Sequence, residues 1–222
     1  MDAGRWWDVD AYFVERLSLS DEALDGALER SARAGLPEIA VSAPHGALLE
    51  ILVRSTGSRR ILEIGTLGGY SALRLARGAG DDGHVITIEA EETHAAIARN
   101  TIEAAGMTSR VTVVVGRALT VLDSMIEESV EPFDFVFIDA DKESNVDYLD
   151  RAVTLGKAGS MLYVDNVVRD GAVLDETSDR GDVVGTRALF DALHGHPRLT
   201  STAVQTVGTK GYDGFVVALM TG

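Results

Sequence analysis

An acidic side chain just before a glycine-rich turn is the feature of this sequence best suited to hold a ligand. Glu63 belongs to the short apolar run 61–64, which is typical of a buried strand, and the helix-forming segment 72–76 follows shortly after. Three glycines within five residues separate the two (Gly65, Gly68 and Gly69). Because glycine lets the backbone come close to a ligand and a helix start offers free N–H groups, the stretch predicts a nucleotide-like ligand.

The order of residues in this turn indicates which kind of nucleotide it would hold. The spacing is neither the G-x-G-x-x-G of dinucleotide sites nor the G-x-x-x-x-G-K-[ST] of phosphate loops. The carboxylate of Glu63 would repel a pyrophosphate and attract an ammonium group. The turn therefore favours a positively charged nucleoside, such as S-adenosylmethionine (SAM). An NAD-dependent oxidoreductase and a purely structural turn are the alternatives.

A second acid lies at the end of the next predicted strand. The segment 84–89 ends in Glu89, somewhat beyond the roughly 20 residues usual for an acid that follows such a turn. In doubly wound sheets an acid at this place accepts hydrogen bonds from ribose hydroxyls. The alternative is that Glu89 caps, or starts, the helix predicted from Glu91 onward.

Oxygen-bearing side chains follow two further predicted strands. The buried strand 133–139 ends at Asp139, and the next strand, 160–165, ends at Asp165 and is followed by Asn166. If the two strands are neighbours, these side chains converge, because ligands bind outside the carboxyl ends of parallel strands. Two carboxylates and an amide oxygen suit Mg²⁺, and also Mn²⁺ or Ca²⁺. The alternative is that they cap the helices that follow.

A lysine lies three residues after the first of these acids. Burial and nearby positive charge would drive Lys142 towards its neutral form, and it would then accept a proton from a substrate hydroxyl. The alternative is an ordinary lysine on a solvated face.

Composition excludes several classes of function. The chain has 222 residues and a net charge of −15, so its surface repels nucleic acid and anionic membranes. It has no cysteine, which excludes disulfides, thiolate catalysis and zinc–thiolate sites and is compatible with a cytoplasmic location. No signal peptide is visible, and no apolar run approaches the roughly 18 residues of a membrane span.

The hydrophobic pattern predicts an α/β fold. Residues 8–34 are expected to be helical, with Ser20 as an N-cap, and Pro44 is expected to open a helix. From Arg60 onward strands alternate with helices, which predicts a doubly wound, mostly parallel sheet with helices on both faces. The last two strands, 199–206 and 214–220, form an antiparallel hairpin. We expect a single domain over 1–222, with a helical segment at about 1–57 and a core at 58–222.

Taken together, these motifs resemble the small cation-dependent O-methyltransferases, the family of catechol and caffeoyl-coenzyme A O-methyltransferases. The matching segments are LEIGTLGGYSA (62–72), Glu89, Gly116-Arg117-Ala118, FVFIDADK (135–142) and YVDNVVRDGAV (163–173). The resemblance implies the Rossmann-like class I methyltransferase fold, with a seven-stranded sheet whose last strand is antiparallel. It also implies SAM as the methyl donor, and a homodimer.

The resemblance assigns roles by motif position. Glu63 and Ser71 would hold the amino-acid end of the donor, and Gly65 and Thr66 would line it, beside Gly68. The other implied donor contacts are Glu89 to the ribose, Ala118 to the adenine, Val41 and Ser42 in a closing loop, and Asp139 at the border of the donor. Asp139, Asp165 and Asn166 match the metal ligands, and Lys142 matches the position of a proposed base.

The resemblance does not identify the acceptor molecule. The loop 166–182 and the ending 207–215 differ from the family pattern, and both are expected near the acceptor. The reaction we expect is cation-assisted methyl transfer to a hydroxyl of a small catechol-like or polyphenolic molecule. A non-catalytic SAM-binding module is a further alternative, which the intact acidic cluster opposes.

Overall fold

The computed structural model describes residues 3–222, which form two compact units. The first unit holds the described residues up to Ala118 together with Gly208–Lys210. The second holds Leu119–Val207 and Gly211–Gly222. The single domain expected from the sequence stays a prediction.

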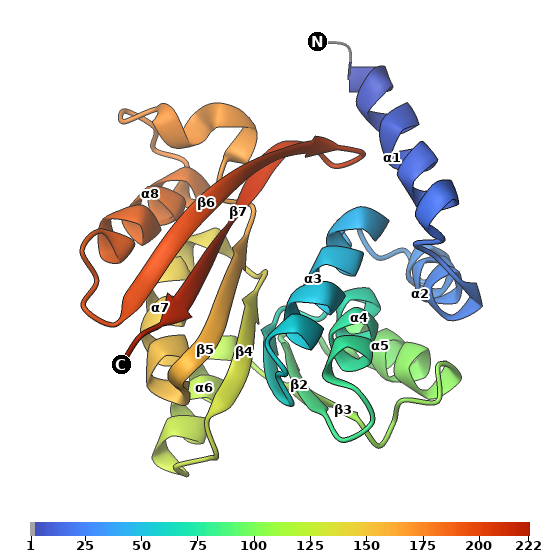
Figure 1. Cartoon of the computed structure of the whole chain (residues 1–222), viewed down its shortest axis with the longest axis horizontal. Helices are drawn as coiled ribbons and strands as arrows, with labels where there is room; N and C mark the ends of the chain where they lie inside the picture. Colours follow the sequence, from blue (N-terminus) through green and yellow to red (C-terminus); the bar gives the residue numbers. More distant parts are fainter. Residues whose placement is uncertain (1–2) are drawn as a thin grey trace. The chain divides into compact units, whose positions relative to one another are not determined.

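Seven strands form one mixed sheet with helices around it (Figure 1). The strands are β1 (Arg60–Ile64), β2 (His84–Glu89), β3 (Val111–Val115), β4 (Phe133–Ile138), β5 (Gly156–Asp165), β6 (Leu199–Gly208) and β7 (Gly211–Met220). Their order is β3-β2-β1-β4-β5-β7-β6. The predicted doubly wound, mostly parallel α/β fold with antiparallel strands at its end is confirmed.

The first unit places its two acids at the ends of parallel strands. Strands β1, β2 and β3 pair in parallel, with Glu63 opposite Thr87 and Glu89 opposite Val115. The helices of this unit are α1 (Ala3–Leu17), α2 (Glu22–Arg33), α3 (Ala43–Ser55), α4 (Tyr70–Ala79) and α5 (Glu92–Ala104). Helix α4, which follows the glycine turn, is buried along most of its length.

The N-terminal helical region differs from the prediction at one cap. Helix α2 begins after Asp21, whose Oδ1 accepts hydrogen bonds from the N–H groups of Ala23 and Leu24, at 3.1 and 3.2 Å. Ser20 was the predicted cap and is wrong. Asp21 also pairs with Arg77 of α4, at 2.7 Å, and this ion pair together with the two N–H bonds explains the choice of the carboxylate.

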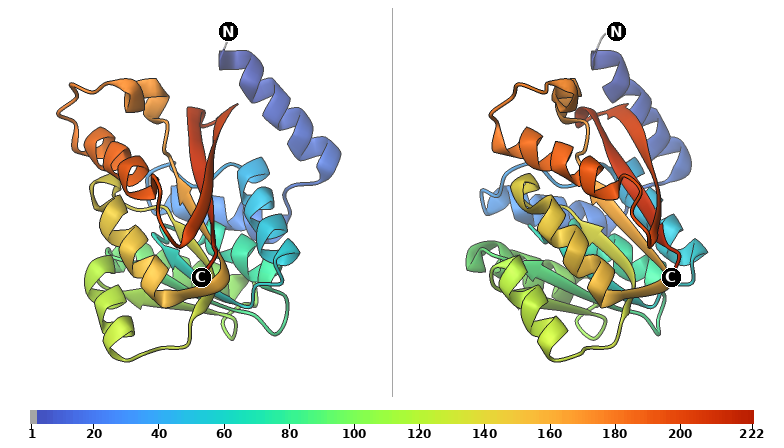
Figure 2. Two further views of the ribbon diagram at one scale, coloured as in Figure 1. Left: turned by 60° about the vertical axis from the view of Figure 1, so that its left-hand side comes forward. Right: turned by 90° about the vertical axis from the view of Figure 1, so that its left-hand side faces the viewer.

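The second unit combines a parallel and an antiparallel strand pair. Strands β4 and β5 are parallel, whereas β7 runs antiparallel to β5, with Asp165 opposite Phe215. Its helices are α6 (Ala118–Glu127), the short η1 (Lys142–Ser144), α7 (Asn145–Leu155), η2 (Arg169–Leu174) and α8 (Gly181–Leu193). Helix α8 packs on α7, η1 and η2 (Figure 2).

An aromatic cluster fixes the three strands that carry the acidic ends of this unit. The Tyr163 ring stacks on Phe215, with centroids 4.6 Å apart, and meets the edge of Phe137 at 5.6 Å. Tyr163 and Phe137 are fully buried. The cluster therefore ties β4, β5 and β7 together near the strand ends that carry the predicted site residues.

Among the described residues, no helix is long and apolar enough to cross a membrane.

Candidate active site

The glycine turn after β1 is a sharply bent backbone segment. Gly65 and Gly69 have φ values of 98° and 88°, which favour glycine, and Leu67 between them also has a positive φ, of 50°. Glu63, at the end of β1, is fully buried. A carboxyl group beside such a turn offers a negative charge to a cationic ligand group.

Glu89 organises this turn. Its Oε2 accepts hydrogen bonds from the N–H groups of Thr66, at 3.3 Å, and Leu67, at 2.8 Å. Its Oε1 accepts one from the N–H of Glu91, at 3.0 Å. The capping alternative considered for Glu89 is wrong, because Glu91 is the N-cap residue of α5 and Glu89 bonds only the N–H of that cap residue. The bonds to the glycine turn were not expected. A carboxylate offers about four acceptor sites, so these bonds leave room for a ribose hydroxyl.

Two other residues of the turn have structural partners. The Thr66 hydroxyl lies 2.5 Å from that of Thr87 in β2. At Gly68, an added Cβ would lie 1.9 Å from the Ser31 hydroxyl of α2, so any side chain there would displace that hydroxyl. The predicted approach of a ligand to Gly68 stays a prediction.

The remaining predicted donor contacts lie at helix starts. Val41 is buried just before α3, and the Ser42 hydroxyl caps that helix by accepting from the His45 N–H at 3.4 Å. Ser71 lies in the first turn of α4, and Ala118 is the first residue of α6. Their contacts with a donor stay predictions. Asp139, also predicted at the donor, belongs to the second unit.

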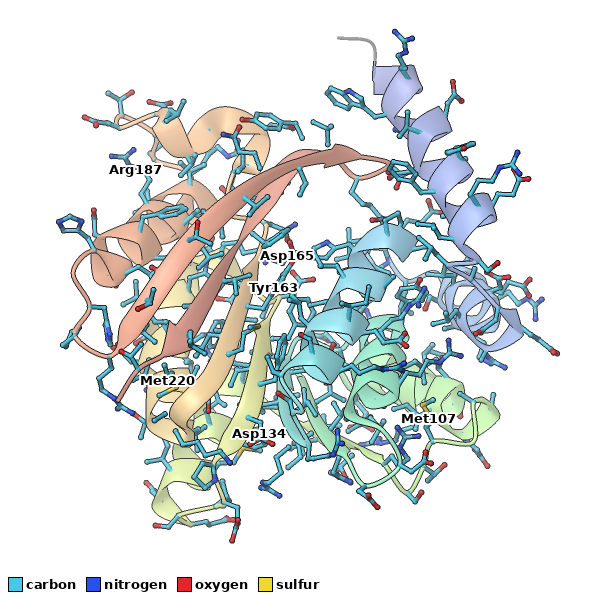
Figure 3. The ribbon with its side chains drawn as sticks, viewed as in Figure 1. Met107, Asp134, Tyr163, Asp165, Arg187 and Met220 are labelled. Atoms are coloured by element: carbon cyan, nitrogen blue, oxygen red, sulfur yellow. The ribbon has the colours of Figure 1, made fainter. Side chains whose placement is uncertain are left out.

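The second unit brings the predicted oxygen ligands together. Asp165 is only 5% exposed at the end of β5, and its Oδ1 accepts a hydrogen bond from the Asn166 N–H at 2.8 Å. Figure 3 shows Asp165 and Tyr163 side by side on β5. Burial, followed by the charge of Asp139, raises the pKa of Asp165 to about 8, against the opposing effect of Lys142. The two carboxyl groups therefore lie close enough to repel each other.

This arrangement fits a divalent cation. Among the described residues, no three His, Cys, Asp or Glu side chains gather in a group that could hold a metal ion. The predicted set is different, because it combines two carboxylates with the amide of Asn166. A cation would offset both the burial and the repulsion by Asp139, which together raise the pKa of Asp165, and oxygen ligands of this kind suit Mg²⁺ or Mn²⁺ with several waters retained.

Lys142 is a buried residue, so the solvated alternative is wrong. Its side chain is only 7% exposed, and its Nζ donates a hydrogen bond to Asp139 Oδ1 at 2.9 Å. The loop around it is also fixed, because the Tyr148 hydroxyl of α7 donates to Asp141 at 2.5 Å. Lys142 and Asp139 therefore form an ion pair at the end of β4.

Helix α8 packs tightly against this lysine. A Cβ at Gly185 would lie 2.2 Å from the Lys142 carbonyl oxygen and 2.6 Å from the Glu143 Cα. Both are backbone atoms, so the helix approaches η1 this closely only with glycine at position 185. The sequence did not identify this residue, because nothing local to it points to Lys142.

Asp213 is a second residue that the sequence left without a role. It is the third residue of β7, and its carboxylate accepts hydrogen bonds from the backbone N–H groups of Val168 and Arg169, which follow Asn166. The sequence Gly211-Tyr212-Asp213-Gly214 was a visible signal for a turn, but its partner lies 45 residues away.

Comparison with known proteins identifies the family. A family model described as O-methyltransferase matches residues 15–218. The catechol O-methyltransferase of Mycobacterium tuberculosis is 49% identical over 213 residues, which cover 96% of this chain and 95% of that protein.

Solved structures agree with this match. The O-methyltransferase from Bacillus cereus in complex with SAH has a TM-score of 0.97 and 46% identity, covering 99% of this chain and all of that one (100%). The O-methyltransferase TomG from Streptomyces achromogenes, involved in tomaymycin synthesis and in complex with SAM, has a TM-score of 0.96 and 45% identity, covering 100% of both chains. The family predicted from the sequence is confirmed: this chain belongs to the SAM-dependent O-methyltransferases.

Proposed function

We propose that the enzyme transfers the methyl group of SAM to a hydroxyl of a small catechol-like or polyphenolic acceptor, with a divalent cation held by Asp139, Asp165 and Asn166. The observation that carries this proposal is the buried Asp165 beside Asp139 and Lys142 at the ends of β4 and β5. The name of the Mycobacterium tuberculosis relative, catechol O-methyltransferase, supports the acceptor class.

The donor is assigned to the turn after β1. We assign the amino-acid end of SAM to Glu63 and Ser71, and the ribose to Glu89, because carboxylates pair with ammonium groups and accept from hydroxyls. The further assigned contacts are Gly65, Thr66 and Gly68 in the turn, Val41 and Ser42 before α3, Ala118 at the adenine and Asp139 at the border.

The acceptor is assigned to the ends of β4 and β5. A divalent cation, Mg²⁺ first and Mn²⁺ or Ca²⁺ as alternatives, would supply a Lewis acid that lowers the pKa of a neighbouring hydroxyl. Asp139 and Asp165 would supply carboxylate oxygens, and Asn166 its amide oxygen. Two adjacent hydroxyls on the acceptor match such a site better than one, because both oxygens can be bound together.

Lys142 is assigned as the group that accepts the proton of the acceptor hydroxyl. The hydrogen bond from its Nζ to Asp139 fixes the amine next to the assigned cation ligands, and in this scheme Lys142 acts as the general base for that proton. The resulting oxygen anion attacks the methyl carbon of SAM. An oxygen–carbon bond forms as the sulfur–carbon bond breaks, and a methyl ether and neutral S-adenosylhomocysteine result.

Membership of this family removes the NAD-dependent oxidoreductase from the alternatives. A non-catalytic SAM-binding protein would be revealed by donor binding without methyl transfer. We further propose, from the family resemblance and the composition, that the enzyme is a cytoplasmic homodimer.

The first prediction concerns Glu89. Glu89→Ala should weaken SAM binding by at least about tenfold, because charge-assisted hydrogen bonds contribute about 1.5–3 kcal/mol each. It should also lower the thermal unfolding temperature, because three backbone N–H groups lose their acceptor. Calorimetric titration with SAM and thermal unfolding measure the two effects. Glu91→Ala, which removes an exposed carboxylate nearby, is the control. An unchanged SAM affinity in Glu89→Ala would remove Glu89 from the donor site.

The second prediction concerns the cation. Asp165→Ala and Asn166→Ala should reduce methylation severely and leave SAM affinity intact, since a Lewis acid at the reacting oxygen contributes several kcal/mol, or about 10² in rate or more. EDTA should do the same to the wild type, and Mg²⁺ or Mn²⁺ should restore activity. Restoration should improve as the pH rises towards 8, because Asp165, with a pKa raised to about 8, keeps a competing proton below that pH.

Asp134→Ala is the matched control, because Asp134 lies at the opposite end of β4 and pairs with Lys157. Acceptors with a single phenol should be much poorer substrates than catechols. Full activity in EDTA, with equal use of both acceptor types, would exclude a catalytic role for the cation. The methyltransferase assignment would remain.

The third prediction concerns Lys142. Lys142→Ala should lower kcat by a factor of about 10² to 10⁴ with a smaller effect on acceptor KM, as expected for the loss of a general base. Lys157→Ala removes an exposed lysine and should be neutral. Steady-state kinetics across neutral to alkaline pH is the measurement. If Lys142→Ala turns over like the wild type throughout, the lysine is not the base.

The fourth prediction uses two glycines one turn apart in α8. Gly185→Ala should lower kcat by about tenfold or more, because displacing η1 misplaces Lys142, while SAM affinity is retained. Gly181→Ala should be neutral, because its Cβ meets only the flexible Glu143 side chain. Kinetics and thermal unfolding of both variants are compared. Equal kcat values in the two variants would show that α8 does not set the lysine position.

A further inference from the structure

The chain leaves β5 through an unusual backbone segment. Asn166, Arg169 and Asp170 have φ values of 58°, 56° and 56°, in the left-handed region that residues other than glycine rarely adopt. Such conformations persist only where surrounding bonds hold them. The segment begins with a proposed cation ligand, so whatever holds it also sets the direction of the Asn166 side chain.

Asp213 of β7 is the group that holds this segment. Its Oδ1 accepts hydrogen bonds from the N–H groups of Val168, at 2.9 Å, and Arg169, at 3.1 Å. The same oxygen accepts the N–H of Gly214 at 3.0 Å. One carboxylate oxygen thus replaces the strand partner that these N–H groups lack in the turn.

Asn166 is held from both directions along the chain. On one side, Asp165 pairs with Phe215 in the antiparallel ladder. On the other, the Val167 N–H donates to the Gly214 carbonyl at 3.0 Å, next to the Asp213 bonds. A Cβ at Gly214 would lie 2.4 Å from the Val204 carbonyl oxygen, so the path of β7 here depends on glycine.

A salt bridge extends this attachment to α8. The Arg169 guanidinium donates to Asp182 Oδ2, at 3.0 Å from Nε and 2.5 Å from Nη2, and its Nη1 lies 4.0 Å from Asp213 Oδ2. Arg187 of α8, labelled in Figure 3, donates to the Val173 carbonyl at 2.8 Å. The segment after Asn166 is therefore bonded to β7 and to α8.

We propose that Asp213 is a positioning residue, which fixes Asn166 for the cation and thereby selects which of two adjacent acceptor hydroxyls is methylated. This inference rests on the proposed function. Asp213 touches neither reactant in this scheme. It acts through the backbone of residues 167–169, so its loss lets Asn166 move and loosens both the cation and the acceptor bound to it.

The test compares Asp213→Ala with Asp213→Asn, which keeps an oxygen acceptor of similar shape. The control is Asp150→Ala, which removes an exposed carboxylate from α7 in the same unit. Two readouts are used: the affinity of the metal-free protein for Mn²⁺ by calorimetry, and the ratio of the two monomethyl products formed from 3,4-dihydroxybenzaldehyde. Asp213→Glu takes the place of the alanine variant if the latter does not fold.

Asp213→Ala should weaken Mn²⁺ binding by about 10- to 100-fold and shift the product ratio towards an even mixture. Asp213→Asn should recover most of both properties, and Asp150→Ala should match the wild type. A lower unfolding temperature with unchanged Mn²⁺ affinity and product ratio would reduce Asp213 to a purely structural role. EDTA treatment of the wild type separates the premises: if activity is lost in EDTA and the Asp213 variants behave normally, only this inference fails. If the wild type binds no Mn²⁺ and is active in EDTA, both proposals fail.

Discussion

The burial of one carboxyl group, that of Asp165, is the constraint on which the proposed acceptor site depends. The aromatic cluster of Phe137, Tyr163 and Phe215 packs around the buried strand β5. Asp165, at the end of this strand, is therefore also shielded from water. Asp139 adds a second negative charge, and together these raise the pKa of Asp165. Only positive charge makes such a pair favourable, which explains why Lys142 is buried with it.

The surrounding elements follow from keeping that cluster in place. Helix α8 packs against the backbone of η1, which carries Lys142, and that close approach requires glycine at position 185. The strand end must also turn away immediately after Asp165, which places Asn166 in a left-handed conformation that Asp213 holds through the next residues. The glycine and the aspartate thus serve the same cluster from two different elements.

The sequence predicted elements wherever the pattern was local. Strands 84–89 and 111–115 end where predicted, because short runs rich in β-branched residues favour the strand conformation. The sequence failed where a distant partner decides. Asp21 replaces Ser20 as a cap because of Arg77, Gly68 packs against Ser31, and Gly185 and Asp213 act on residues more than a helix away in the chain. One sequence shows the residue but not its partner.

The proposed donor and acceptor sites are organised by different kinds of contact. The donor turn is held by Glu89 through backbone bonds to the turn itself and to the next helix, all within 23 residues, so its geometry is set by a short stretch of chain. The proposed acceptor end is held by β7 and α8, and the segments that depart from the family pattern, loop 166–182 and residues 207–215, lie next to these contacts. Changes in those late segments can therefore alter the acceptor without altering the bonds that shape the donor turn. That division explains why the family and its donor could be identified from the sequence, whereas the acceptor could be named only by chemical class.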